Sequence, residues 1–263
     1  MNILKALFGG KTEDPEERKQ DEEAKNFDIL KFDGVKALHM GQADYAINCF
    51  NNALKYQEDL EIRDYLSQAY LMANEPLKAY EQLQQLAEAQ PDNQKIFIRM
   101  ADVAYRIDDY GAMADACEKA LLIDKRSPTV HYLYARACIG QGDNVNAVSM
   151  LTQAILTTPE YLDAYLLRGE TLLDMENLEE AEEDANFLLE HVDGNEDALL
   201  LKARIEKAKG YNAAALEYYD KVIESNPFHA EAFKERGDVR EALGDLKRSE
   251  EHTSELQSLR EIS

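Results

Sequence analysis

The sequence contains no tryptophan, and it has only 12 glycines and 6 prolines in 263 residues. An all-β fold needs many short turns rich in glycine and proline, so this scarcity argues against one. The three cysteines, Cys49, Cys117 and Cys138, form no CxxC pair and no cluster. They therefore indicate neither a zinc site nor a disulfide framework, and they suit a reducing compartment.

Basic residues are scarce relative to acidic ones, with 29 Lys and Arg against 52 Asp and Glu and a formal net charge of −23. Nucleic-acid affinity depends largely on cations that neutralise phosphate, so we expect no nucleic-acid ligand. The acidic surface favours solubility and steers basic partners toward the chain. A solvated exterior without partner preference is the alternative interpretation.

Long apolar runs are absent as well. No stretch approaches the roughly 18 apolar residues of a membrane span, so we expect no stable membrane insertion. The N-terminal MNILKALFGGK is too short for a signal peptide, and no small-residue cleavage site follows it. These features predict a cytoplasmic protein.

The chain repeats itself with a period of about 34 residues, a length typical of stacked helical repeats. Pro91, Pro159 and Pro227 are evenly spaced, two periods apart. Turn-forming residues recur once in each period, and only the first step is shorter, by one position. This turn column is Gly41, Asn74, Asp108, Gly142, Glu176, Gly210 and Gly244.

Small and apolar residues align in further columns at the same period, and apolar spacing inside each unit is helical. Two columns are mostly small, which lets two antiparallel helices approach closely. They are Gly34, Ser67, Ala101, Ala135, Gly169, Ala203 and Gly237, and then Ala46, Ala79, Met113, Ala147, Ala181 and Ala215. Two further apolar columns are Phe50, Leu83, Cys117, Leu151, Ala185 and Tyr219, and then Ala53, Leu86, Ala120, Ala154, Leu188 and Val222.

With these columns, the chain resembles the tetratricopeptide repeat family, most closely in the segments DAYLLRGETLL (163–173) and LEYYDKVIESNP (216–227). The resemblance implies an all-α fold, a right-handed superhelical solenoid of antiparallel helix pairs. It covers about six and a half repeats within residues 27–247. Their expected bounds are 27–59, 60–93, 94–127, 128–161, 162–195, 196–229 and a truncated 230–247.

Three residues depart from the family pattern. Met113 stands in an alanine column, and Glu206 and Arg240 replace the usual aromatic or aliphatic residue. The third, sixth and seventh units are therefore the ones that the pattern supports least.

The two ends lie outside the repeats. Residues 1–26 are expected to be a flexible or short-helix segment, in which MNILKALF offers one apolar face for a weak membrane or partner contact. Residues 248–258, RSEEHTSELQS, are identical to the translation of a common sequencing-adapter oligonucleotide. Residues 259–263 are explained by an index sequence and the adapter bases that follow it. We therefore expect 248–263 to be a non-native tail.

No catalytic arrangement is found in the sequence. The histidines show no metal-ligand spacing, and GxSxG, P-loop and GxGxxG motifs are missing. Acidic pairs such as Asp108 with Asp109 suit helix starts rather than acid–base catalysis. We expect no enzyme activity, no metal, no cofactor and no small-molecule substrate.

The resemblance implies that the first helix of each repeat lines a groove that binds a protein or peptide. Aromatic and arginine side chains beside aliphatic ones suit peptide capture. The alternative is that these positions are ordinary solvated helix faces. The residues that the resemblance assigns to the groove are Lys95, Arg99, Asp102, Tyr105, Arg106, Tyr132, Arg136, Leu166, Glu170 and Arg204.

One subfamily binds a C-terminal carboxylate through a clamp of two asparagines and three cations. Lys31, Lys95 and Arg99 match the cationic clamp positions. Val35 and Tyr65 replace the asparagines, whose amides contact the carboxylate. We therefore expect this clamp not to function here.

The sequence thus predicts a protein-interaction scaffold or adaptor. Two alternatives remain open: the array is the recognition arm of an enzyme whose catalytic domain lies beyond the C-terminus, or it is a chaperone-like holder.

Overall fold

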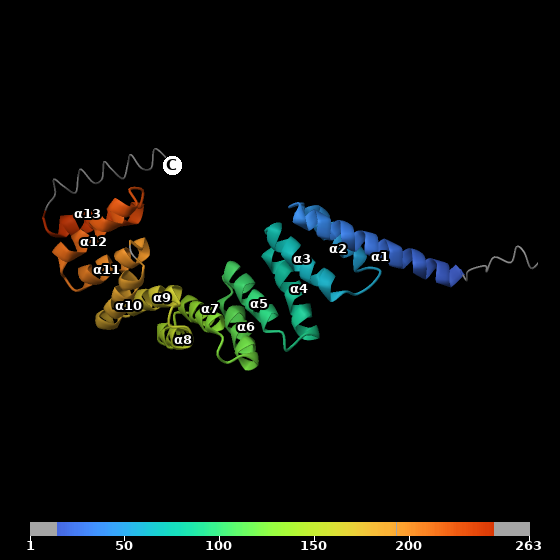
Figure 1. Cartoon of the computed structure of the whole chain (residues 1–263), viewed down its shortest axis with the longest axis horizontal. Coiled ribbons are helices and arrows are strands. Elements are labelled where there is room, and N and C mark those ends of the chain that lie inside the picture. Colours follow the sequence, from blue (N-terminus) through green and yellow to red (C-terminus); the bar gives the residue numbers. More distant parts are fainter. Residues whose placement is uncertain (1–14, 193, 245–263) are drawn as a thin grey trace, which may run out of the picture. The chain divides into compact units, whose positions relative to one another are not determined.

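The computed structural model describes residues 15–192 and 194–244, and within them every regular element is a helix, as expected for an all-α fold (Figure 1). The expected apolar face of MNILKALF and the expected adapter-derived tail lie outside the described residues. The helices are α1 Pro15–His39, α2 Ala43–Ala53, α3 Leu60–Met72, α4 Pro76–Ala89, α5 Gln94–Arg106, α6 Tyr110–Ile123, α7 Pro128–Gly140, α8 Asn144–Thr157, α9 Leu162–Asp174, α10 Leu178–His191, α11 Glu196–Ala208, α12 Asn212–Ser225 and α13 Ala230–Ala242.

The chain divides into two compact units, residues 1–123 and 124–263. Helices α1 to α6 belong to the first unit and α7 to α13 to the second. Inside each unit, every helix packs against the helix that follows it. In addition, α1 packs on α3 and α9 packs on α11, so first helices of successive pairs also meet.

The odd-numbered helices from α3 onward begin at residues 60, 94, 128, 162, 196 and 230, which repeats the period of the sequence. The start of α1 is different, because this helix begins at Pro15 and residues 15–26 continue directly into the first repeat. Pro91, Pro159 and Pro227 each follow the end of a second helix. Proline is favoured there because it cannot continue the helix.

The turn column adopts a left-handed backbone conformation at every one of its positions. Gly142 has a φ of 77°, which glycine reaches at no steric cost. Asn74, Asp108 and Glu176 have φ values of 58°, 55° and 61°, and glutamate is the least suited of these to such a backbone. The turn between the helices of a pair therefore has one recurring geometry.

The small columns are buried and mark close helix contacts. Ala79, Ala147 and Ala181 have no exposed surface. A Cβ added to Gly34 would lie 2.5 Å from Phe50 Cε1, a separation that real side chains do not tolerate. At a position such as Gly34, a larger residue does not fit unless its neighbours shift.

The three departures from the family pattern have structural explanations. Met113 is completely buried and fills its alanine position. Glu206 forms an ion pair with Lys202 at 3.1 Å, and Arg240 lies 3.9 Å from Asp220. Polar pairing thus replaces apolar packing at two of the three positions.

Among residues 15–192 and 194–244, no helix combines the length and the apolar character needed to cross a bilayer.

Candidate partner-binding surface

The groove residues expected from the sequence lie on first helices, in both units. The first unit contributes the five on α5, from Lys95 to Arg106. In the second unit, the groove residues come from three helices. Tyr132 and Arg136 are on α7, Leu166 and Glu170 on α9, and Arg204 on α11.

In the first unit, two cations of the carboxylate clamp are held by the chain's own acids. Arg99 pairs with Asp64 of α3 and donates from Nη2 to Ser67 Oγ at 2.5 Å. Lys31 of α1 lies 2.7 Å from both Asp59 and Glu61. These cations join neighbouring first helices, which argues further against a working clamp.

The rest of the α5 set reaches solvent. Lys95, Asp102 and Arg106 are exposed, and Tyr105 retains 39% of its surface. The Tyr105 ring lies edge-on to the Tyr110 ring, with centroids 6.2 Å apart. This part of the helix offers an aromatic ring with both signs of charge beside it.

In the second unit, α7 carries an aromatic and cationic group. The guanidinium of Arg136 lies 5.9 Å from the centroid of the Tyr132 ring, and the centroid of the Tyr161 ring lies 5.3 Å from that of Tyr132. Burial, together with Tyr132, raises the pKa of Tyr161 to about 12, so its hydroxyl keeps its proton at neutral pH. Tyrosine and arginine are among the residue types that most often anchor interfaces.

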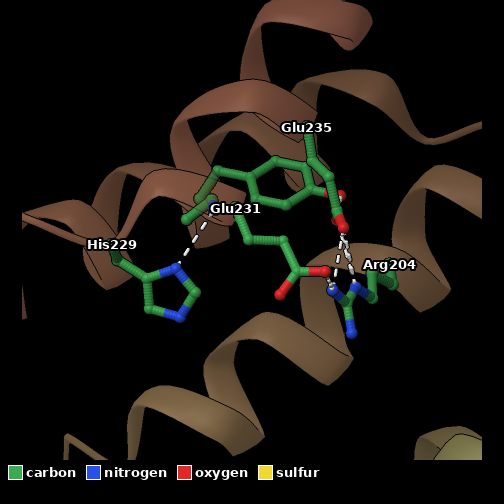
Figure 2. Close-up of polar contacts among 6 residues, drawn as sticks. Arg204, His229, Glu231 and Glu235 are labelled. Carbon is green, nitrogen blue, oxygen red and sulfur yellow. Dashed lines mark hydrogen bonds and ion pairs between the residues drawn. The ribbon is translucent and has the colours of Figure 1, made fainter. Parts of the chain in front are cut away.

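Arg204 is the centre of a polar group that joins α11 to α13. Figure 2 shows Glu231 and Glu235 of α13 converging on its guanidinium, at 2.7 Å and 2.8 Å. Tyr219 donates to Glu235 at 2.8 Å. Burial opposes ionisation of Glu235, but the hydrogen bonds from Arg204 and Tyr219 outweigh it and lower the pKa of Glu235. Glu235 is therefore a stable anion, and two carboxylates already engage Arg204.

His229 fixes the start of α13 beside this group (Figure 2). Its Nδ1 accepts a hydrogen bond from the backbone N–H of Ala232 at 3.2 Å. The ring thus caps one of the N–H groups that have no partner inside a helix. The cap helps to fix the start of α13, the helix that brings Glu231 and Glu235 to Arg204.

Glu170 and Leu166 of α9 are in different situations. Burial raises the pKa of Glu170, and the positive charge of Arg204 offsets only part of this effect. Glu170 is therefore influenced by the same guanidinium that holds the acids of α13. Leu166, by contrast, packs against the core cluster that contains Leu172 and Ala181.

A cavity of about 580 Å³ opens beside Arg204 on the first helices of the second unit. Leu173 of α9 and Ala208 of α11 supply its apolar surface. Its remaining walls carry equal numbers of cations and carboxylates, which makes the cavity a receptacle of mixed charge. The charged lining residues are Arg204, Lys207, Lys234, Glu231, Glu235 and Asp238.

On α11, the sequence indicated Arg204 but not Lys207. No groove position was assigned in the seventh repeat, so the lining residues from α13 were missed as well. Sequence reasoning also did not anticipate that Arg99 and Arg204 pair with acids of a neighbouring first helix. The repeat register places these helices side by side, but the choice of ion-pair partner depends on side-chain rotamers. No signal in one sequence specifies those.

Within the described residues, no group of three or more His, Cys, Asp or Glu side chains is arranged to hold a metal ion.

Two sequence profiles of tetratricopeptide repeats match the chain, one over residues 139–205 and the other over residues 200–257. No curated protein matches the chain. The two profiles therefore detect repeats in the second half of the chain, where the first-helix cavity lies.

Solved structures resemble a larger part of the chain. A tetratricopeptide repeat protein from Parabacteroides merdae has a TM-score of 0.72 at 14% identity, and the match covers 89% of this chain and 93% of that one. PilW, described as a type IV pilus biogenesis factor, has a TM-score of 0.67 at 18% identity, covering 78% and 94%. YrrB, described as having an unusual peptide-binding site, has a TM-score of 0.55 at 18% identity, covering 67% and 91%. At these identities, the matches establish the fold alone.

Proposed function

Because this chain carries tetratricopeptide repeats, we propose that it is an interaction scaffold whose first helices bind a peptide segment of mixed charge from a partner protein. Proteins with these repeats generally act through such interactions. We propose in addition that this role is non-enzymatic and is carried out in the cytoplasm.

The observation that carries the proposal is the mixed-charge cavity between α9, α11 and α13. Arg204 is already held by two glutamates, so a partner carboxylate would meet Lys207 and Lys234, which are both exposed. A partner cation would meet Asp238 on the same cavity wall. The apolar surface of the cavity would contact an aliphatic side chain between the two charges.

The aromatic and cationic groups on α5 and α7 support the same proposal. Tyr105 and Arg106 stand on α5, and Tyr132 and Arg136 on α7. Each pair combines a ring, which supplies contact area, with a guanidinium, which donates to carboxylates. In a chain of net charge −23, such pairs give the first helices local binding sites for acidic groups.

Site-specific photo-crosslinking tests the position of the binding surface. A photoreactive amino acid replaces Lys207 or Lys234 in the full chain. Matched controls carry it at Glu217 or Glu224, which are exposed on the second helix α12. We expect adducts with the same partner proteins at the two first-helix positions and none at the controls. Equal adducts at all four positions would place the binding surface elsewhere.

Charge reversal tests the recognised chemistry. Lys207→Glu combined with Lys234→Glu should abolish capture of the crosslinked partner, because these two exposed positions would then repel its carboxylates. Exposed helix charges change stability by only about 0.5 kcal/mol, so circular dichroism should show an intact fold. Retention of every partner by the double variant would contradict the proposal.

A further inference from the structure

A second depression lies in the first unit. It is a cleft of about 1150 Å³ between the second helices α4 and α6, and α5 contributes to its floor. It is somewhat larger than the roughly 300–1,000 Å³ of ordinary small-molecule pockets, which leaves room for several side chains of a bound segment.

The floor and one end of the cleft are apolar. Phe97 and Met100 of α5 lie at the floor and are almost completely buried, while Ala112 and Ala116 of α6 supply small side chains. At the end of α6, Leu122 is 78% exposed although it lines the cleft. A large aliphatic side chain left in water beside an apolar floor gains free energy when another apolar group covers it.

The rim of the cleft is acidic. Four exposed carboxylates line it, and Lys119 is the one cation among its described lining residues. The acids come from several places along the chain, so they surround the cleft instead of following one helix face. They are Glu88 of α4, Asp92 after α4, Asp109 before α6 and Asp115 of α6.

Tyr80 of α4 connects the acidic rim to the cleft interior. Its side chain is half-buried, and burial followed by the charges of Asp109 and Asp115 raises the pKa of its hydroxyl group. These two carboxylates therefore act on Tyr80 from the facing wall. A cation that enters the cleft beside them is attracted by both carboxylates.

We propose that this cleft binds a cationic amphipathic segment of a partner protein, in which lysine or arginine residues flank a short apolar run. The apolar run covers Leu122 and the Phe97 floor, and the flanking cations meet the carboxylates of the rim. This is a second interaction surface, made mainly by second helices, and it does not depend on the first-helix surface proposed above.

The test uses a fluorescein-labelled synthetic helical peptide in which lysines flank four leucines on one face. Fluorescence anisotropy measures its dissociation constant for the full chain. Two control peptides replace either the lysines with glutamates or the leucines with serines. We expect binding of the lysine and leucine peptide only, because each control removes one of the two complementary features. Equal binding of either control peptide would overturn the proposal.

Charge reversal of two rim residues tests whether the peptide binds at the cleft itself. Glu88→Lys with Asp115→Lys should weaken binding by about tenfold or more, since like charges then oppose the peptide. The matched control is Glu179→Lys with Glu180→Lys on α10, which changes the net charge by the same amount outside the cleft. Equal weakening by both double variants would reduce the binding to general charge attraction and overturn the proposal.

Truncation of the exposed leucine tests the apolar contact. Leu122→Ser should weaken binding by about tenfold, the loss expected for one buried leucine side chain. Leu156→Ser on α8 is the control, because Leu156 is similarly exposed but does not line the cleft. Thermal melts of both variants check that the fold persists. If a folded Leu122→Ser variant binds the peptide with unchanged affinity, the proposed apolar contact in the cleft is wrong.

One outcome would assign the cleft to a different occupant. The chain's own residues 1–11 combine Lys5 and Lys11 with an apolar run and no acid. If Ile3→Asp with Leu7→Asp makes the full chain bind the peptide more tightly, the chain's own N-terminal segment competes for the cleft. That result would overturn the assignment to a partner protein.

Discussion

With tyrosine set aside, Ser67 is the one buried polar side chain among the described residues of the first unit. The second unit instead buries several charged side chains, which are Asp184, Lys202, Glu206 and Arg236. Both units consist of the same kind of helix pair, and the same columns of the repeat are buried in both. The first unit therefore holds its helix pairs together mainly by apolar packing, and the second adds charged groups to the packing.

The buried charges of the second unit are paired across helices. Arg168 of α9 donates to Asp184 of α10 at 2.6 and 2.9 Å. Lys202 of α11 pairs with Glu182 of α10 and with Glu206 of its own helix. A buried ion pair contributes little net stability, but the loss of one partner is costly because the other charge stays buried. The comparison thus predicts different sensitivities of the two units to the same kind of substitution.

The largest expected difference comes from removing one buried cation. Lys202→Met leaves Glu206 buried without its ion-pair partner and should lower the free energy of unfolding by about 3 kcal/mol. Its counterpart in the first unit, Arg99→Met, removes an ion pair whose side chains are partly exposed and should cost less than about 1 kcal/mol. Urea unfolding followed by circular dichroism measures both, and equal losses would break the comparison.

Overpacking a small column should affect both units alike. Ala147→Leu in the second unit and Ala79→Leu in the first should each lower stability by about 1–3 kcal/mol, because both alanines are completely buried. Lys125→Ala, at an exposed position between helices, should cost almost nothing. Urea unfolding of the three variants tests this prediction. A leucine variant as stable as the parent would contradict the repeat register assigned to that alanine.

In the second unit, Glu182 should make stability depend on pH. Hydrogen bonds from Lys202 and then Lys209 lower the pKa of Glu182 to about 2, from an ordinary value of 4.5. The folded-state pKa is the lower one, so this carboxylate stabilises the fold above about pH 5, and its contribution is lost as the pH falls toward about 2. Glu182→Gln should therefore flatten the dependence of stability on pH in this window. Thermal melts across the window, with Glu179→Gln as the exposed control, show whether the slope changes.

The smallest expected effect concerns the turns. In the first unit, the left-handed positions are glycine, asparagine and aspartate, but in the second one of them is Glu176. Glu176→Gly should raise stability by about 1 kcal/mol, since glycine removes the steric cost of a positive φ. Asn74→Gly in the first unit should gain less, because asparagine tolerates this conformation. Thermal melts compare the two, and a larger gain at Asn74 would contradict this explanation.

The repeat period and the turn column were enough to predict the fold. Helix pairing follows from apolar spacing along the chain, and a left-handed turn favours particular residues at a fixed position, so both are visible in the sequence. Close helix approach also restricts the residue type at each contact, and for this reason Ala79 and Ala147 could be assigned to buried contacts from their columns alone.

The candidate surface was predictable only as a set of positions. Helical register places Tyr105, Arg106 and Tyr132 on first helices, and their role in binding remains a proposal. The sequence did not reveal that Arg99 and Arg204 are held by acids of neighbouring helices, nor that second helices enclose an apolar cleft with an acidic rim.

The sequence by itself determined the repeat, the turns and the buried columns, because each depends on local periodicity and on the size or backbone freedom of single residues. Tertiary structure decided which charges are paired and where the surface is hollow. Those features depend on the distance between side chains of different helices and on their rotamers, and many acids of this acidic chain could reach each arginine. Only the packed arrangement selects Asp64 for Arg99 and Glu235 for Arg204.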